Sequence, residues 1–220
     1  MSQHDFVIDN QSFPATRTDI NDAILAIISN SSGATAPTTT YANQFWYDTS
    51  TDILKARNEA NSAWINLFTI GSQNVLLGDA ALDSNVSGTA NTAIGNSALT
   101  SNTASNNTAV GYQAAYSTTT GAYNTAFGYQ TLLDNTTGYA NAAFAADAMG
   151  NNTTGFDNTA LGNASMFQNT TGSSNVALGR AALQNNTTAS NNTAVGYQAG
   201  HSNTTGTQNV AMGSSSLYSN

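Results

Sequence analysis

The chain lacks cysteine altogether and has few charged side chains: four Lys and Arg, twelve Asp and Glu, and two His among 220 residues. Without cysteine it forms neither a disulfide nor a thiolate metal site, and it is compatible with any redox compartment. With a net charge of −8, it has no Lys/Arg stripe of the kind that binds a phosphate backbone, so we expect no nucleic-acid binding. Charged residues make up 7% of the chain, against about 25% in a typical globular protein.

Long hydrophobic runs are also missing. No apolar stretch approaches the ~20 residues of a membrane span, so we expect no membrane insertion. The first residues, MSQHDFVIDNQ, have acid and amide side chains where an export signal has a basic region followed by an apolar run. Apolar residues nevertheless make up 40% of the chain, which is more than disordered segments usually contain. The placement of these residues therefore decides the fold.

What the chain does contain is a repeated phrase, Asn-Thr/Val-Ala-apolar-Gly, which occurs nine times after residue 73. Its Asn, position 1 of the repeat, recurs every 17 residues, except for one step of 16 residues near residue 100. Regular copies are typical of repeat architectures, in which each unit buries its apolar face against its neighbours. We expect the position 1 asparagines to stack as a ladder: Asn74, Asn91, Asn107, Asn124, Asn141, Asn158, Asn175, Asn192 and Asn209.

Positions 2 and 4 are Thr or apolar in each copy and share one face of a short strand. We expect this face, which includes Val110 and Val195, to point into the interior. Position 3 is Ala in eight copies and position 5 is Gly in eight, with Ala145 as the exception. The opposite face is therefore nearly bare and allows close approach of another backbone. The expected glycine ladder consists of Gly78, Gly95, Gly111, Gly128, Gly162, Gly179, Gly196 and Gly213.

The length of the repeat predicts its architecture. Seventeen residues are too few for a strand and a helix, and apolar spacings of 3, 4 and 7 are absent from the copies. A second apolar row at position 9 and the turn sequence NTTG near positions 12 to 15 complete the unit. We therefore predict a mainly β protein with a parallel β-solenoid, or β-roll, of nine turns over residues 71–220. The 16-residue step should be a shortened turn near residues 103–106 that leaves the strand stack unbroken.

Composition changes near residue 70, where we place the end of an N-terminal module of residues 1–70. A cap, an apolar stripe and a glycine predict a helix over about residues 18–30. Three short strands predict a β-meander over about residues 44–68, so the module should be α+β. Its two tryptophans fit the module's own core slightly better than a direct contact. Because Trp and Arg are enriched at interfaces, we expect the module to be the anchor, with these residues: Ile20, Ile24, Ile27, Ile28, Trp46, Lys55, Arg57 and Trp64.

The phrase NTAVGYQA followed by NTTG, at residues 192–206, resembles the repeats of bacteriophage tail fibres and related virion fibre proteins. Over a shorter stretch, NTAIG at residues 91–95 resembles the core motif of trimeric autotransporter adhesin heads. The sequence FWYDTSTDILKARNEANSAWINL, at residues 45–67, resembles a module found near the start of phage tail fibres. The repeats and this module together cover most of the chain.

This resemblance implies a homotrimeric structural fibre located in the virion. Its N-terminal module would dock on other virion proteins of the tail or capsid, and its repeat shaft would project outward for host adhesion. Fibres of this type often end in a receptor-binding tip or a self-cleaving chaperone domain, whereas residue 220 lies twelve residues into the ninth copy. We therefore expect either a fragment of a longer fibre or a chain that another protein caps.

No residue set in the sequence predicts catalysis, a metal site or a cofactor. The acids of the repeats fall at different positions, which disfavours the carboxylate pair of a tailspike-like polysaccharide-degrading enzyme. His4 and His201 stand alone. The regular threonines leave open an ice-binding or adhesin solenoid, although position 2 alternates between Thr and Val as a packed position does. Position 6 offers either plain surface packing or contacts to a host glycan or receptor through Tyr112, Tyr129 and Tyr197.

Overall fold

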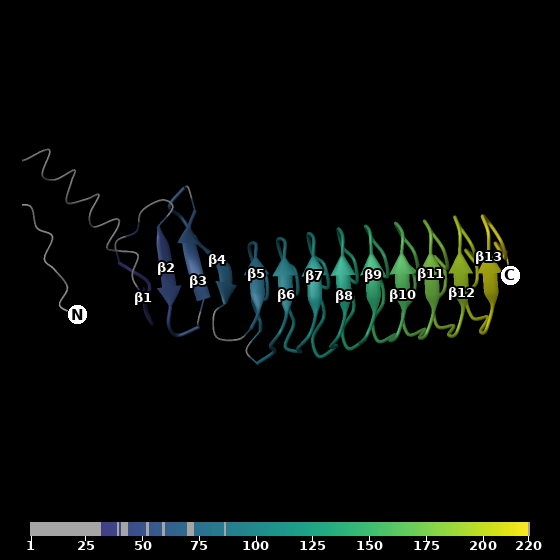
Figure 1. Ribbon diagram of the computed structural model, residues 1–220, viewed down its shortest axis with the longest axis horizontal. Helices are drawn as coiled ribbons and strands as arrows, with labels where there is room; N and C mark the ends of the chain where they lie inside the picture. The colour runs from purple at the N-terminus through teal and green to yellow at the C-terminus, as the bar shows by residue number, and fades with distance from the viewer. Residues whose placement is uncertain are drawn as a thin grey trace, which may run out of the picture. The chain divides into compact units, whose positions relative to one another are not determined.

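The computed structural model divides the chain into two compact units, Met1–Ile70 and Gly71–Asn220 (Figure 1). The helix predicted over residues 18–30, with Ile20, Ile24, Ile27 and Ile28, lies outside the residues that the structure describes. Those described residues, to which every structural statement below refers, are 32–38, 40, 44–51, 53–58, 60–69, 73–85 and 87–219.

The first unit contains a four-stranded sheet with the order β1-β2-β3-β4. Strand β1 pairs with β2 in parallel, whereas β2, β3 and β4 form an antiparallel meander where the sequence predicts one. Side chains alternate along β2, so that Trp46 and Asp48 are buried, whereas Phe45, the first residue of the strand, is exposed. The strands are β1 (Ser32–Gly33), β2 (Phe45–Asp48), β3 (Ile53–Arg57) and β4 (Trp64–Thr69).

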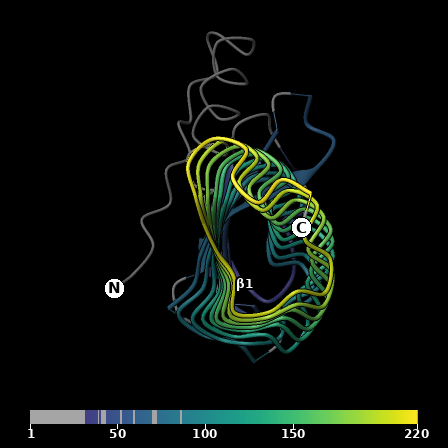
Figure 2. The ribbon, with the colours of Figure 1, turned by 90° about the vertical axis from the view of Figure 1, so that its right-hand side faces the viewer.

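The second unit is a parallel β-solenoid, which confirms the predicted fold. Its nine described strands form one sheet in strict chain order, and each pairs in register with the next copy. Viewed along this unit, successive turns superimpose closely (Figure 2). The strands are β5 (Val75–Leu77), β6 (Thr92–Ile94), β7 (Thr108–Val110), β8 (Thr125–Phe127), β9 (Ala142–Phe144), β10 (Thr159–Leu161), β11 (Val176–Leu178), β12 (Thr193–Val195) and β13 (Val210–Met212).

The prediction that positions 2 and 4 face the interior is wrong. Ala109 and Ala194, at position 3, are 0% exposed and belong to the core. Val110 and Val195 lie on the outer face of the sheet, where they are only partly covered. The alternation along the strand was assigned correctly, but the larger side chains point outward. The reason is that the interior of a 17-residue turn is narrow. Because long side chains from the opposite wall of the turn fill most of it, the strand has room to place only a methyl group there.

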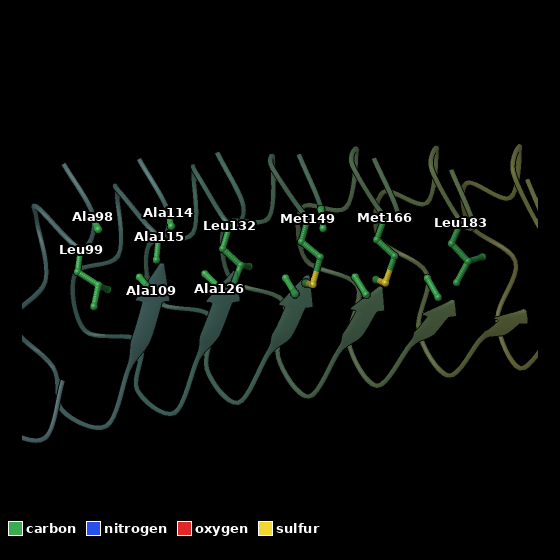
Figure 3. Close-up of a cluster of buried hydrophobic side chains, with 14 of the residues drawn as sticks. Ala98, Leu99, Ala109, Ala114, Ala115, Ala126, Leu132, Met149, Met166 and Leu183 are labelled. Atoms are coloured by element: carbon green, nitrogen blue, oxygen red, sulfur yellow. The ribbon is translucent and has the colours of Figure 1, made fainter. Parts of the chain in front are cut away.

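That opposite wall is the position 9 row of Leu and Met. In Figure 3, Leu132, Met149 and Met166 point from the wall across the strands toward the alanines of position 3. Each of these three side chains is 0% exposed. At position 9 of a later turn, a Cβ built on Gly200 would lie 3.7 Å from the Cβ of Ala194, so positions 9 and 3 meet inside the turn. Small alanines and long Leu or Met side chains thus fill the core by complementary size.

Buried asparagine side chains join the turns. Asn124 Oδ1 accepts the backbone N–H of Asn141 at 3.1 Å, and Asn124 Nδ2 donates to the Gly138 carbonyl at 2.8 Å. Asn135, at position 12, donates to the same carbonyl at 3.0 Å. The position 12 asparagines form a second buried ladder, in which Asn152 Nδ2 donates to Asn135 Oδ1 at 2.7 Å. These amides therefore provide the partners that buried backbone groups in the turns require.

The position 5 glycines lie where the backbone of the next turn approaches closely. Gly111 has a φ of 137°, and a Cβ built on it would lie 2.3 Å from the Gly128 carbonyl oxygen. Ala145, the exception in the row, adopts a φ of 91°. Both the left-handed backbone and the neighbouring turn therefore select glycine at this position.

The 16-residue step is absorbed in a turn, as the sequence predicts. Strands β6 and β7 on either side of it remain paired in register. Asn102 Nδ2 donates to the carbonyl two residues ahead, that of Ala104, whereas Asn135 reaches the carbonyl three residues ahead. The missing residue therefore lies between Asn102 and Ala104, and the deletion leaves the sheet intact.

Candidate binding surfaces

The outer face of the solenoid sheet is an uncharged, largely apolar surface. Its position 4 side chains are partly or well exposed, with Phe127 at 53% and Leu161 at 52%. The rings of Phe127 and Phe144 stack with centroids 6.4 Å apart. Eight steps of about 4.8 Å give the row a length of about 38 Å. We call it the sheet-face row: Leu77, Ile94, Val110, Phe127, Phe144, Leu161, Leu178, Val195 and Met212.

The sheet-face row is suited to contact with another apolar surface, since contiguous exposed apolar patches mark interaction sites. Position 2, its neighbour on the same face, is partly covered Thr in five copies. Its alternation of Thr and Val does not reflect burial in the core, contrary to the argument made from the sequence. The change in size from Val110 to Phe127 along the row makes this face uneven, which disfavours an array that orders water in a flat layer.

The position 6 tyrosines lie at the corner that follows each strand. The rings of Tyr112 and Tyr129 stack with centroids 5.5 Å apart and planes 14° apart. Tyr197 lies four turns beyond Tyr129, and the guanidinium carbon of Arg180 lies over its ring, 5.8 Å from the ring centroid. All three tyrosines are about half exposed. The structure therefore brings two of the three candidate contact residues together and leaves the third apart.

A second aromatic pair lies on the other side of the strands and was missed from the sequence. The rings of Tyr139 and Phe156, two residues before the ladder asparagines, stack with centroids 4.8 Å apart and planes 4° apart. Tyr123, on the preceding turn, is 66% exposed. Aromatic residues at the same position of consecutive copies are the signal that would have found this pair.

In the first unit, the four candidate anchoring residues that the structure describes form one cross-strand cluster. The ring centroids of Trp46 and Trp64 lie 5.4 Å apart. Lys55 Nζ lies 4.9 Å from the ring centroid of Trp46, and Arg57 Cζ lies 5.4 Å from the ring centroid of Trp64. Lys55 Nζ also donates to Asp48 Oδ2 at 2.8 Å. Trp46 is buried, so its role in the unit's core is established, whereas the anchoring role of the cluster stays a prediction.

The carboxyl of Asp48 has a strongly shifted pKa. Burial acts to raise the pKa of its carboxyl, but hydrogen bonds from Lys55, Ser50 and Thr51 outweigh burial and hold the pKa well below its ordinary value. The carboxylate is therefore charged at all physiological pH values and belongs to the structural core of the unit.

Within the part of the chain that the structure describes, no group of three His, Cys, Asp or Glu side chains could hold a metal ion. A helix long and apolar enough to cross a membrane is likewise not found among the described residues. The ring of His201 stacks on Tyr218 with centroids 4.8 Å apart, and its Nε2 lies 2.9 Å from Gln184 Oε1.

The fold defines the chain as a β-solenoid repeat protein. No protein-family model, curated protein or solved structure matches it. The functional argument therefore depends on the solenoid and on the surfaces described above.

Proposed function

We propose that the chain is a structural fibre protein of a virion, with the first unit as its anchor and the solenoid as its shaft. The observation that supports this most directly is the unbroken stack of nine paired strands. Each copy of the repeat adds about 4.8 Å of length, and hydrogen bonds between turns make the stack a stiff spacer. The resemblance of the repeats and of residues 45–67 to phage fibre sequences gives the virion context.

The shaft is proposed to assemble as a homotrimer through the sheet-face row. This row is free of charge and runs the full length of the sheet, so a lone chain would expose it to water. Copies of the same chain have rows of equal length and equal spacing, which allows their side chains to interdigitate from one end to the other. Three shafts joined in this way would protect more apolar surface than any contact confined to one turn.

The anchor and the shaft can be tested separately in virus particles. Deleting residues 1–70 should give fibres that fold but do not join the particle. Deleting residues 141–191, three whole repeats, should shorten the fibre by about 14 Å, at about 4.8 Å per turn, and leave attachment intact. Electron microscopy of labelled particles measures both outcomes. Particles that still incorporate the fibre without residues 1–70 would contradict the proposal.

The assembly is tested by placing a charge in the sheet-face row. Leu161→Asp should dissociate the trimer, because the carboxylate would be buried against identical copies without a partner. Thr171→Asp, at an exposed turn of the same region, is the matched control and should leave assembly unchanged. Sedimentation of the purified chain gives the answer, and a wild-type monomer at micromolar concentration would exclude the trimer.

A further inference from the structure

We propose that the corner beside Tyr129 is a binding site for a neutral saccharide chain. The site, which we call the tyrosine step, lies at position 6 of four successive turns and comprises Tyr112, Tyr129, Ala146 and Asn163. The proposal deepens the virion-fibre function proposed above and depends on it only in identifying the saccharide as a host-surface glycan. Binding of a saccharide to the purified chain does not require a virion.

The tyrosine step exists because the stack of tyrosine rings ends after two turns. One face of the Tyr129 ring lies against Tyr112, 5.5 Å away between centroids. On its other side, the next two turns contribute only the methyl group of Ala146 and the short amide of Asn163. Among the described residues, no other ring stacks on Tyr129, which is 51% exposed. A flat aromatic face is therefore open to a ligand at this corner.

Hydrogen-bonding groups held by the fold flank this open face. Gln130 follows Tyr129 directly, and its Nε2 donates to Gln113 Oε1 at 2.8 Å, which holds the amide in place. Asp147 occupies the same position one turn later and is half-buried. The side chain of Asn163 is tied to the backbone by its Nδ2, which donates to the Ala146 carbonyl at 3.1 Å. These contacts position polar groups before any ligand arrives.

This combination matches the chemistry of a sugar. A pyranose has an apolar face of C–H groups, which packs on an aromatic ring, and a rim of hydroxyls, which need hydrogen-bond partners. The Asp147 carboxylate accepts hydrogen bonds from hydroxyls, and its charge disfavours an anionic saccharide. Tyrosine also provides contact area at a small cost in conformational entropy. The next long side chain at position 6 is Arg180, three turns or about 14 Å beyond Tyr129, which leaves room for a chain of sugars.

The test titrates the full chain with three neutral probes, maltohexaose, chitohexaose and mannohexaose, up to about 10 mM. Saturation-transfer NMR detects binding, and the dissociation constant follows from the titration. We expect at least one probe to bind, and Tyr129→Leu to weaken its binding about tenfold. Ala146→Tyr should abolish binding, because the new ring would continue the stack and cover the open face. Tyr123→Leu, which removes an exposed tyrosine elsewhere, should bind as the wild type does.

The Ala146→Tyr variant separates a binding role from a structural one. An added ring in the stack should leave the melting temperature unchanged or raise it, so lost binding would not reflect unfolding. The proposal is overturned if none of the three probes binds, or if Ala146→Tyr binds like the wild type. It is also overturned if Ala146→Tyr changes sedimentation, since the corner would then be a contact between copies. Particle-borne fibres that bind no probe contradict this inference alone, whereas chains that bind a probe but join no particle contradict only the fibre proposal.

Discussion

The asparagine ladder makes a quantitative prediction for Asn141→Ala. Asn141 is 1% exposed; its Oδ1 accepts the N–H of Asn158 at 3.1 Å, and its Nδ2 donates to the Gly155 carbonyl at 2.8 Å. The Gly155 carbonyl keeps a second donor, Asn152 Nδ2 at 3.0 Å, so alanine leaves one buried group, the Asn158 N–H, without this partner. The unsatisfied Asn158 N–H costs roughly 1–3 kcal/mol, a range that already includes its lost hydrogen bond, and the lost bond to the Gly155 carbonyl adds about 1 kcal/mol. We expect a total loss of about 3 kcal/mol.

The assay is chemical unfolding of the full chain followed by far-ultraviolet circular dichroism, which reports mainly the solenoid strands. The matched control is Asn151→Ala, which removes an exposed amide that donates to Gln168 Oε1 at 3.1 Å in the same region. This control should cost less than about 0.5 kcal/mol, as surface substitutions usually do. If Asn141→Ala destabilises the chain no more than Asn151→Ala, the ladder does not carry the stability assigned to it.

Three further predictions concern the glycine row, the backbone and the first unit. Gly111→Ala should destabilise the solenoid by more than about 3 kcal/mol, because its Cβ would lie 2.3 Å from the next carbonyl oxygen, whereas Gly213→Ala, which meets nothing within 4 Å, should cost less in the same melt. Ala90→Gly should stabilise it by roughly 0.5–1 kcal/mol, because Ala90 is exposed at a φ of 56°; an unchanged melting temperature would contradict this. Because the folded-state pKa of Asp48 lies below its ordinary value of 3.8, its stabilisation is present above that value and is lost as pH falls toward the folded-state pKa. Lys55→Met should therefore weaken the first unit at neutral pH but much less in strong acid, as measured by the fluorescence of Trp46 and Trp64, the chain's only tryptophans.

The 17-residue period and the residue types of the repeat predicted the solenoid correctly, because both act within one turn and its contact with the next. A spacing of 17 residues excludes a helical crossover, and glycine at position 5 is explained by the 2.3 Å approach at Gly111. The inward face was assigned wrongly, because the size of Val110 and Phe127 was taken as a sign of burial. Which face is buried depends on the width of the turn and on the Leu and Met side chains opposite, and neither follows from the strand sequence alone.

The candidate surfaces were predicted less completely than the fold. Exposure of Tyr112 and Tyr129 followed from their place after the strand, but the packing of their rings required the turn-to-turn register. The second asparagine ladder was missed because NTTG also suits a solvent-exposed tight turn. Asn135 and Asn152 are 0% exposed because each satisfies a carbonyl inside its own turn and an amide on the neighbouring one. A turn sequence alone does not distinguish these two roles.

The two asparagine ladders also give the solenoid a net side-chain dipole along its axis. In both, the side-chain donor lies on the later turn and the acceptor on the earlier one, as in Asn158 to Asn141 and Asn152 to Asn135. Side-chain amide dipoles aligned in this way add along the axis, whereas the backbone bonds of the sheet run in both senses between turns. Each amide also polarises the next. Solenoids that lie side by side in parallel therefore repel weakly along these rows and antiparallel ones attract, so a parallel bundle depends on its apolar contacts to overcome this preference.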